Sequence, residues 1–234
     1  MVLVDTIYQR VLAIANKEQR GYITPQEFNL LANQAQMAIF DQYFYDINQA
    51  SRIPGNETEY SDTIKTLNEK ISLFKTHEHL TKSGSFFLYP VNMYKLGTVW
   101  YSETGIQYGV ELQEINYDEL IDVNKSPLTS PTQTNPIYIR REEGLKIFPT
   151  GGWSNNKIIA TYTRKPHKVE WGYVVTNEQA LYNASSSTDF ELHSSEETML
   201  VMRILELAGI IMNKPGLVQI GQQEQTEITA QQKQ

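Results

Sequence analysis

The spacing of the hydrophobic residues changes twice along this chain of 234 residues, and that change limits the folds it can adopt. Up to about residue 82 the apolar residues recur three and four positions apart, which is typical of helices that bury one face. From there to about residue 173, short runs of β-branched and aromatic residues alternate with turn residues and indicate strands. A helical spacing returns near residue 195. We therefore predict an α+β fold in which helices at both ends enclose an antiparallel β middle.

Start signals and helical spacing predict three helices before the β middle. The first is expected over about residues 3–17. The second begins at Thr24, an N-cap residue followed by Pro25 and then by Glu27 as the partner of a capping box. It continues to about residue 49. Apolar residues at spacings of four and three over residues 60–74 predict the third helix.

The β middle is expected to centre on a three-stranded meander. Residues 137–140 and 145–149 flank a short polar turn, and residues 157–164 supply the third strand. A further hairpin is predicted where residues 98–101 and 110–112 flank a Glu-Thr-Gly turn.

The expected domain organisation follows these changes of pattern. Residues 1–82 are expected to form a bundle of about three helices, and residues 83–173 an antiparallel β region. Residues 174–220 are expected to form a loop and a C-terminal helix that packs back on the bundle, and residues 221–234 a polar tail. Residues 174–188 are mostly polar and are predicted to form a loop. The last helix is expected over about residues 195–212, capped by Ser194 or Ser195.

Composition excludes several classes of protein. The chain has no cysteine, which excludes disulfides, thiolate nucleophiles and Cys-based metal sites. No apolar run approaches the roughly 20 residues of a membrane-spanning helix, and the first residues lack the pattern of a signal peptide, so we expect synthesis and folding in a cytoplasm. The net charge of −7 argues against a protein that grips DNA or an anionic membrane, because phosphate neutralisation needs clustered Lys and Arg.

Residues 16–27 match the spacing of a calcium-binding EF-hand loop between two predicted helices. Gly21 stands at the position of the invariant glycine and Glu27 at that of the bidentate carboxylate. Asn16 and Arg20, however, occupy positions where carboxylate ligands are expected. A glycine that ends one helix and a capping box that begins the next explain the same residues. We favour the capping interpretation and keep a Ca²⁺-binding module as an alternative.

Other residues that could carry chemistry form no recognisable site, and we predict no catalytic, cofactor-binding or metal-binding residue. No ligand spacing joins the four histidines, which are His77, His79, His167 and His193. On a helix, the first two would point to different sides. The acidic pairs at 142–143 and 196–197 fit a solvated turn and a helix start. No phosphate-binding loop or dinucleotide fingerprint is present.

Basic residues gather near the predicted meander in two groups. One is the pair Arg140 and Arg141, and the other consists of Arg164, Lys165 and Lys168 with His167 between the lysines. Two interpretations stay open for these groups. They could form a weak nucleic-acid site, or they could meet an acidic neighbouring subunit.

Several short phrases around these elements point to a family of phage proteins. The phrases are Thr24-Pro25-Gln26-Glu27-Phe28-Asn29, Asn135-Pro136-Ile137-Tyr138, Gly144-Leu145-Lys146-Ile147-Phe148-Pro149, Ile159-Ala160-Thr161-Tyr162 and Tyr162-Thr163-Arg164-Lys165-Pro166. With a helical hairpin before them and a helix after Phe190-Glu191-Leu192, the chain resembles the head-to-tail connector and tail-tube adaptor proteins of short-tailed phages, including crAss-like phages.

This resemblance implies a non-enzymatic structural protein of the virion neck or tail, assembled in the host bacterial cytoplasm. It implies a homo-oligomeric ring, twelve-fold in that family, which joins the portal protein to neighbouring tail ring proteins. DNA would pass through the ring without specific binding, and neither a cofactor nor a membrane would take part. Another virion component, such as a tail-fibre adaptor or a minor head protein, is the alternative within phage proteins.

Overall fold

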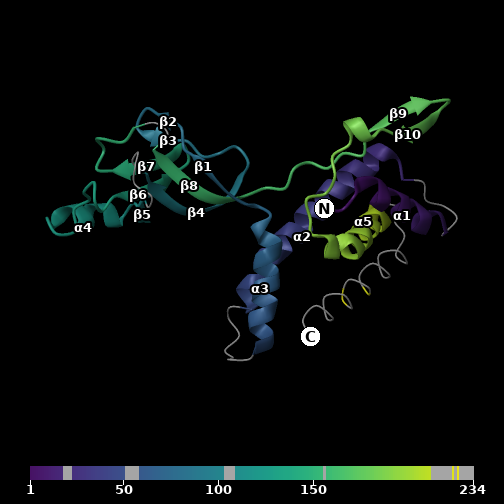
Figure 1. The fold of residues 1–234 in the computed structure, drawn as a ribbon, viewed down its shortest axis with the longest axis horizontal. Helices are drawn as coiled ribbons and strands as arrows, with labels where there is room; N and C mark the ends of the chain where they lie inside the picture. The colour runs from purple at the N-terminus through teal and green to yellow at the C-terminus, as the bar shows by residue number, and fades with distance from the viewer. Residues whose placement is uncertain are drawn as a thin grey trace. The chain divides into compact units, whose positions relative to one another are not determined.

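The computed structural model describes residues 1–17, 23–50, 58–102, 109–154 and 157–211, together with residues 223 and 226. The chain divides into two compact units (Figure 1). The helical unit consists of Met1–Leu73 and Pro166–Gln234, and the strand unit, Phe74–Lys165, is inserted between these two segments. The fold is mixed α+β, as the sequence predicts at this level.

The helical unit is built from helices that bury one apolar face each. It contains α1 (Val4–Lys17), α2 (Pro25–Ala50), α3 (Thr58–Ser72) and α5 (Glu197–Ile211). α5 contacts both α1 and α2, and α3 contacts α2. Large side chains that are fully buried in this unit are Ile7, Phe28, Ile39, Phe40, Phe190, Leu192 and Leu200. Burial of one such side chain contributes about 1.5–3 kcal/mol, so these stripes hold the unit together.

The strand unit carries one eight-stranded sheet and the short helix α4 (Glu119–Lys125). Its strands are β1 (Lys75–His79), β2 (Lys82–Ser83), β3 (Phe86–Phe87), β4 (Met93–Tyr101), β5 (Val110–Glu114), β6 (Ile137–Arg141), β7 (Gly144–Phe148) and β8 (Ile158–Arg164). Their order in the sheet is β1-β8-β4-β5-β6-β7-β3-β2. The β4–β5 hairpin is antiparallel, as predicted, with its turn residues 103–108 outside the described ranges.

The sheet curls on itself, because only Leu80 and Thr81 separate β1 from β2 while these strands stand at opposite ends of the sheet order. The inner face is filled by a cluster of buried residues that includes Leu80, Phe87, Val99, Leu145, Ile147, Trp153 and Ile158. A second cluster lies where Leu120 and Val123 of α4 pack against buried isoleucines. The curled sheet therefore has a core of its own, separate from that of the helical unit.

The predicted antiparallel meander is wrong at its third strand. β6 and β7 form the expected hairpin. β8, however, pairs with β1 on one side and β4 on the other, and β7 takes β3 as its second neighbour. β5 and β6 are parallel, so the β region is not purely antiparallel. The non-local pairing gives β8 hydrogen-bond partners along both of its edges, which a terminal meander strand would lack.

Residues 174–188, predicted to be a loop, contain a second small sheet. It is the antiparallel hairpin of β9 (Tyr173–Thr176) and β10 (Gln179–Tyr182), and the 3₁₀ turn η1 (Ala184–Ser186) follows it. The two turn residues, Asn177 and Glu178, both have positive φ, at 51° and 64°. Such turns usually carry Asn-Gly, because glycine adopts positive φ without steric cost. Because Glu178 stands where glycine is usual, the sequence pattern does not predict this turn.

Strands also begin earlier than the hydrophobic spacing predicts. α3 ends at Ser72, so β1 lies within the range 1–82 that the spacing assigns to helices, and β2 begins at its last residue. β1 reads Lys-Thr-His-Glu-His and is exposed at every residue except Thr76, which is half-buried. β1 has no apolar residue at alternate positions, so the hydrophobic pattern does not predict a strand there.

Candidate interaction site

The segment that resembles an EF-hand loop begins α2 with the predicted capping box. The N–H of Thr24 donates to Glu27 Oε2 at 2.9 Å, and the N–H of Glu27 donates to Thr24 Oγ1 at 3.3 Å. Hydrogen bonds from the backbone and then the side chain of Thr24 lower the pKa of the Glu27 carboxyl. The carboxylate that would bind Ca²⁺ is therefore already used at the helix start. Residues 18–22 of the loop lie outside the described residues.

The histidines lie on strand β1, at residue 167 and at the start of η2. His77 and His79 share one face of strand β1, not opposite sides of a helix, and both are exposed. His193 Nδ1 accepts the N–H of Ser195 at 3.3 Å and so caps η2 (Ser194–Glu196), which takes the place of the predicted serine cap of α5. Within the described ranges, no three His, Asp or Glu side chains are grouped as a metal site.

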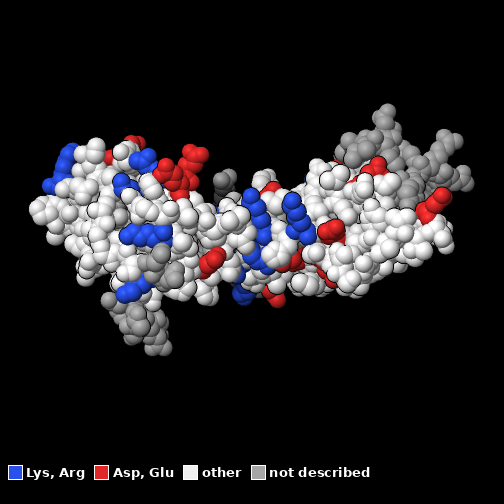
Figure 2. Space-filling model, turned by 90° about the horizontal axis from the view of Figure 1, so that it is seen from above, with Lys and Arg blue, Asp and Glu red and all other residues white. Residues whose placement is uncertain are grey.

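The two basic groups do not lie on neighbouring strands. Arg140 Nη2 donates to Glu114 Oε2 at 2.6 Å, and the guanidinium of Arg141 lies 4.2 Å from the centroid of the Tyr117 ring. Both arginines belong to β6, which β5 and β4 separate from β8 and Arg164. On the face shown in Figure 2, blue and red side chains are interspersed. The sheet therefore gives no support to a nucleic-acid site made from both groups.

An extended segment of residues 167–171, which we call the strap, is bound along α2 by amide side chains. Asn29 binds the backbone of Trp171, Asn33 that of Val169 and Gln36 that of His167. The three amide residues are four and three positions apart, so they lie on one face of α2. The strap residues they bind are two positions apart, because every second residue of an extended chain faces the same side. Each amide therefore binds one strap residue. The Asn and Gln side chains thus replace the neighbouring strand that an extended backbone needs.

An aromatic cluster fixes the base of the β9–β10 hairpin to the helical unit. Trp171 is 4% exposed, and its Nε1 donates to Asp5 Oδ1 of α1 at 3.0 Å. Its ring lies 4.3 Å from that of Tyr8, 5.9 Å from that of Tyr173 and 5.7 Å from that of Tyr182, measured between centroids. Tyr173 and Tyr182 are the first and last residues of the hairpin. The hairpin therefore leaves the helical unit from a rigid base (Figure 1).

Beyond that base, the hairpin presents apolar side chains to solvent. Val174 is 52% exposed, Val175 64% and Leu181 53%. Val174 and Leu181 are cross-strand partners and share one face, whereas Val175 lies on the other face. A two-stranded hairpin is marginally stable by itself in water. Exposed β-branched side chains on such an element are typical of a surface that another protein covers.

A buried polar cluster joins α3 to the start of α5, and sequence reasoning missed it. Glu196, predicted to be a solvated residue at a helix start, is 1% exposed and forms an ion pair with Lys70 of α3. Lys70 Nζ also lies 5.7 Å from the ring centroid of Tyr43. Burial, and then the charge of Glu196, raises the pKa of the Tyr43 phenol. The cluster holds three helices in one arrangement.

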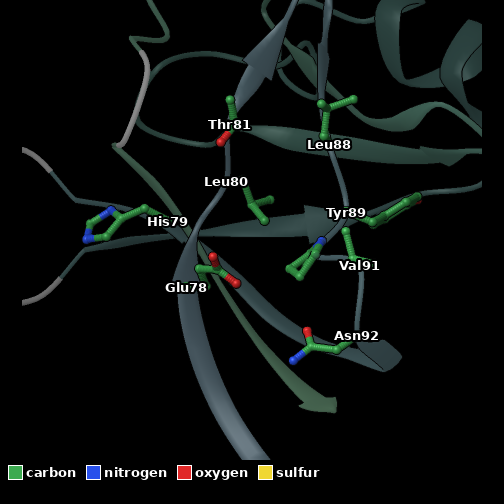
Figure 3. Close-up of a pocket in the computed structure, with 9 residues that line it drawn as sticks. Glu78, His79, Leu80, Thr81, Leu88, Tyr89, Val91 and Asn92 are labelled. Carbon is green, nitrogen blue, oxygen red and sulfur yellow. The ribbon is translucent and has the colours of Figure 1, made fainter. Parts of the chain in front are cut away.

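A groove of about 590 Å³ opens in the strand unit beside β1 (Figure 3). Its walls come from two segments, Glu78 to Thr81 on one side and Leu88 to Asn92 on the other. Leu80 points into the gap and His79 points away from it. Two of the lining residues are bridged by Tyr162, whose Oη donates to Glu78 Oε2 at 2.9 Å and lies 3.2 Å from Asn92 Oδ1. Burial, and then this hydrogen bond to Glu78, raises the pKa of Tyr162 to about 12.

Comparison with models of known protein families finds no match for this chain, and comparison with curated proteins finds none either. In the described part of the chain, every helix is too short or too polar to cross a lipid bilayer. Function is therefore inferred from the geometry above and from the resemblance of the sequence phrases.

Proposed function

We propose that this chain is a non-enzymatic structural protein of a phage virion that forms an oligomeric ring in the neck or tail. The observation that carries the proposal is the β9–β10 hairpin, which is anchored at its base and exposes Val174, Val175 and Leu181 beyond it. Val174 and Leu181 lie side by side on one face of the hairpin, and adjoining exposed apolar side chains are a feature of interaction surfaces. A multi-copy ring supplies a neighbour for the same surface on every subunit.

The placement of the phrases shared with phage connectors supports the same proposal. Residues 135–138 lead into β6, residues 144–149 contain β7, and residues 159–162 lie within β8. The last phrase, residues 162–166, crosses from the strand unit back to the helical unit. The phrases thus stand at strand ends and at the connection between units, where they set the framework of a fold. They contribute no group that carries out chemistry.

In this proposal the helices form one bundle with the C-terminal helix packed back on it, and bundles of adjacent copies make the body of the ring. The ring, twelve-fold by resemblance, joins the portal protein to the next tail ring protein. DNA passes through its channel without specific binding, which the net charge of −7 favours. Assembly takes place in the host bacterial cytoplasm and the ring remains in the virion, without a cofactor or a membrane.

Light scattering and negative-stain imaging of the purified chain, alone and mixed with the phage portal protein, test this proposal. We expect rings of uniform size. Val174→Lys combined with Leu181→Lys should abolish them, because charged side chains would have to be buried in the contact. Leu30→Lys is the matched control, since Leu30 of α2 is 73% exposed on the same unit. Monomers in every mixture, or rings that survive the double substitution, would contradict the proposal.

A further inference from the structure

Strand β1 has one hydrogen-bonding edge that pairs with no strand among the described residues, and the groove lies beside this edge. The N–H of Leu80 donates to the carbonyl of Ile158, and the N–H of Arg164 donates to the carbonyl of Phe74. These contacts set the alternation of the ladder, in which residues 74, 76, 78 and 80 direct their backbone groups toward β8. The backbone groups of His77 and His79 therefore point away from β8, on the edge where His79 lines the groove.

Pro90 explains why this edge stays open. The hairpin of β2 and β3 brings the N–H of Leu88 onto the carbonyl of Thr81 at 2.9 Å. The next hydrogen-bonded pair would join His79 to Pro90, but proline has no N–H to donate. The two segments part at this point and the groove opens between them, as Figure 3 shows.

Within the described part of the chain, the outer edges of the β9–β10 hairpin likewise pair with no other strand. The N–H of Asn183 donates to the carbonyl of Gly172, which places the pairs 172–183, 174–181 and 176–179 in hydrogen-bonded positions. Tyr173 and Val175 therefore direct their backbone groups outward from β9, two residues apart. His77 and His79 on β1 have the spacing common to strand edges, so the backbone groups of the two edges can pair.

The surroundings of the two elements differ in charge, although β1 itself carries one residue of each sign, Lys75 and Glu78. Between Val169 and Met202 the chain has no Lys or Arg, and the hairpin turn carries Glu178. On the other side, β1 begins with Lys75, and Arg164 and Lys165 follow directly at the end of its partner strand β8. Complementary charge favours encounter between an acidic hairpin and this basic end of β1.

We propose that the β9–β10 hairpin of one copy adds as a strand pair to the open edge of β1 in a second copy. Backbone hydrogen bonds to His77 and His79 supply the binding, and the groove beside them receives the apolar side chains of the hairpin. The contact joins the helical unit of one subunit to the strand unit of the next, and a head-to-tail contact of this type is the one from which rings are built. This inference rests on the proposed ring and names the contact that builds it.

The absence of cysteine allows a clean cross-linking test. Two single variants of the full chain, His79→Cys and Val175→Cys, are mixed and treated with a short thiol-specific cross-linker. We expect mixed dimers in several-fold excess over those formed when Gln34→Cys, exposed on α2, replaces the β1 variant. Adding His77→Pro to the β1 variant should remove the excess, because it deletes one outward N–H. His77→Ala keeps that N–H and should retain the excess, and thermal unfolding verifies that both fold.

Each other outcome overturns a stated part of this inference. Without an excess over the control pair, the hairpin does not dock at β1. If the excess survives His77→Pro, the contact is not strand addition. If a chain carrying both cysteines cross-links internally at high dilution, the occupant of the groove is its own hairpin. Rings without the mixed cross-link would support the proposed function and contradict the hairpin contact. A mixed cross-link without rings would support the hairpin contact and contradict the proposed function.

Discussion

Lys70 of α3 and Glu196 of η2 form an ion pair in the interior of the helical unit, with Lys70 Nζ 2.5 Å from Glu196 Oε1. The side chains are only 9% and 1% exposed. Among the described residues, neither Glu196 Oε2 nor the hydroxyl of Tyr43 has a hydrogen-bond partner. An ion pair in such surroundings adds little net stability, but it strongly disfavours any packing of α3 that separates the two charges.

Removal of one partner of this pair should therefore cost far more than removal of both. Lys70→Met leaves a buried carboxylate without its counter-charge and should lower the free energy of unfolding by about 3–5 kcal/mol. Combining it with Glu196→Leu should restore most of that loss. Lys125→Met is the control, because Lys125 and Asp122 pair at the surface with side chains 69% and 77% exposed. Denaturant unfolding measures all four proteins, and equal losses for the single and double variants would refute the pairing.

Asn33 should contribute to stability through the strap, since it both donates to and accepts from the backbone of Val169. Asn33→Ala leaves a part-buried N–H and carbonyl without partners, so we expect a loss of about 1–3 kcal/mol. Asn33→Asp keeps the acceptor and loses the donor, and its loss should be intermediate. Gln34→Ala, one position on and exposed, controls for helix propensity. Hydrogen exchange at Val169 should rise in Asn33→Ala, which removes the acceptor of its N–H, and rise less in Asn33→Asp, which keeps an acceptor; it should stay unchanged in the control.

The accuracy of the sequence predictions depends on how far apart the interacting residues lie. The capping box was predictable, because Thr24 and Glu27 are three positions apart and depend on nothing else in the chain. The β6–β7 hairpin was predictable for the same reason. The partners of β8 were not, since an apolar run says that a strand is buried and not which strands lie beside it.

Buried polar residues were also not predictable from the sequence. Glu196 beside Glu197 has the pattern of a solvated helix start, and only the three-dimensional fold brings Lys70 to it. The amides of α2 likewise gave no pattern of their own, because their partners are backbone groups of a distant segment. Of the candidate site, the exposed hairpin was missed because Asn177 and Glu178 form its turn without a glycine.

Acid should weaken the start of α2 through Glu27. Its pKa is lower in the folded chain than in the unfolded chain, because the backbone and side chain of Thr24 donate hydrogen bonds to the carboxylate. The stabilisation is complete above the unfolded pKa and is lost as the pH falls through the folded pKa. Glu27→Gln removes this titration, so the stability difference between wild type and variant should shrink on acidification. Thermal unfolding of both proteins at neutral and acidic pH measures this difference in stability.

The same variant separates a capping box from a calcium site. Since the Glu27 carboxylate is occupied by Thr24, calorimetric titration of the wild-type chain with Ca²⁺ should give no saturable binding. Binding in the micromolar range that Glu27→Gln abolishes would overturn the capping interpretation and restore the EF-hand alternative.

Alkaline pH should destabilise the strand unit through Tyr138. Its hydroxyl donates to Glu114 Oε2 at 3.1 Å, and burial, followed by the charge of Glu114, raises its pKa to about 12. The unfolded chain releases this proton near the ordinary tyrosine pKa of about 10, so the folded state binds more protons between the two values. Stability should be constant below the lower pKa and fall as the pH rises from it toward the upper one.

Tyr138→Phe tests that dependence without changing the shape of the side chain. The variant loses the hydrogen bond to Glu114 and should be less stable than the wild type at neutral pH by about 1 kcal/mol. It also loses the titration, so this deficit should narrow as the pH rises through the alkaline range. Denaturant unfolding at a series of pH values gives both quantities. A deficit that stays constant up to the pKa of about 12 would mean that Tyr138 releases its proton equally readily in the folded and unfolded chain.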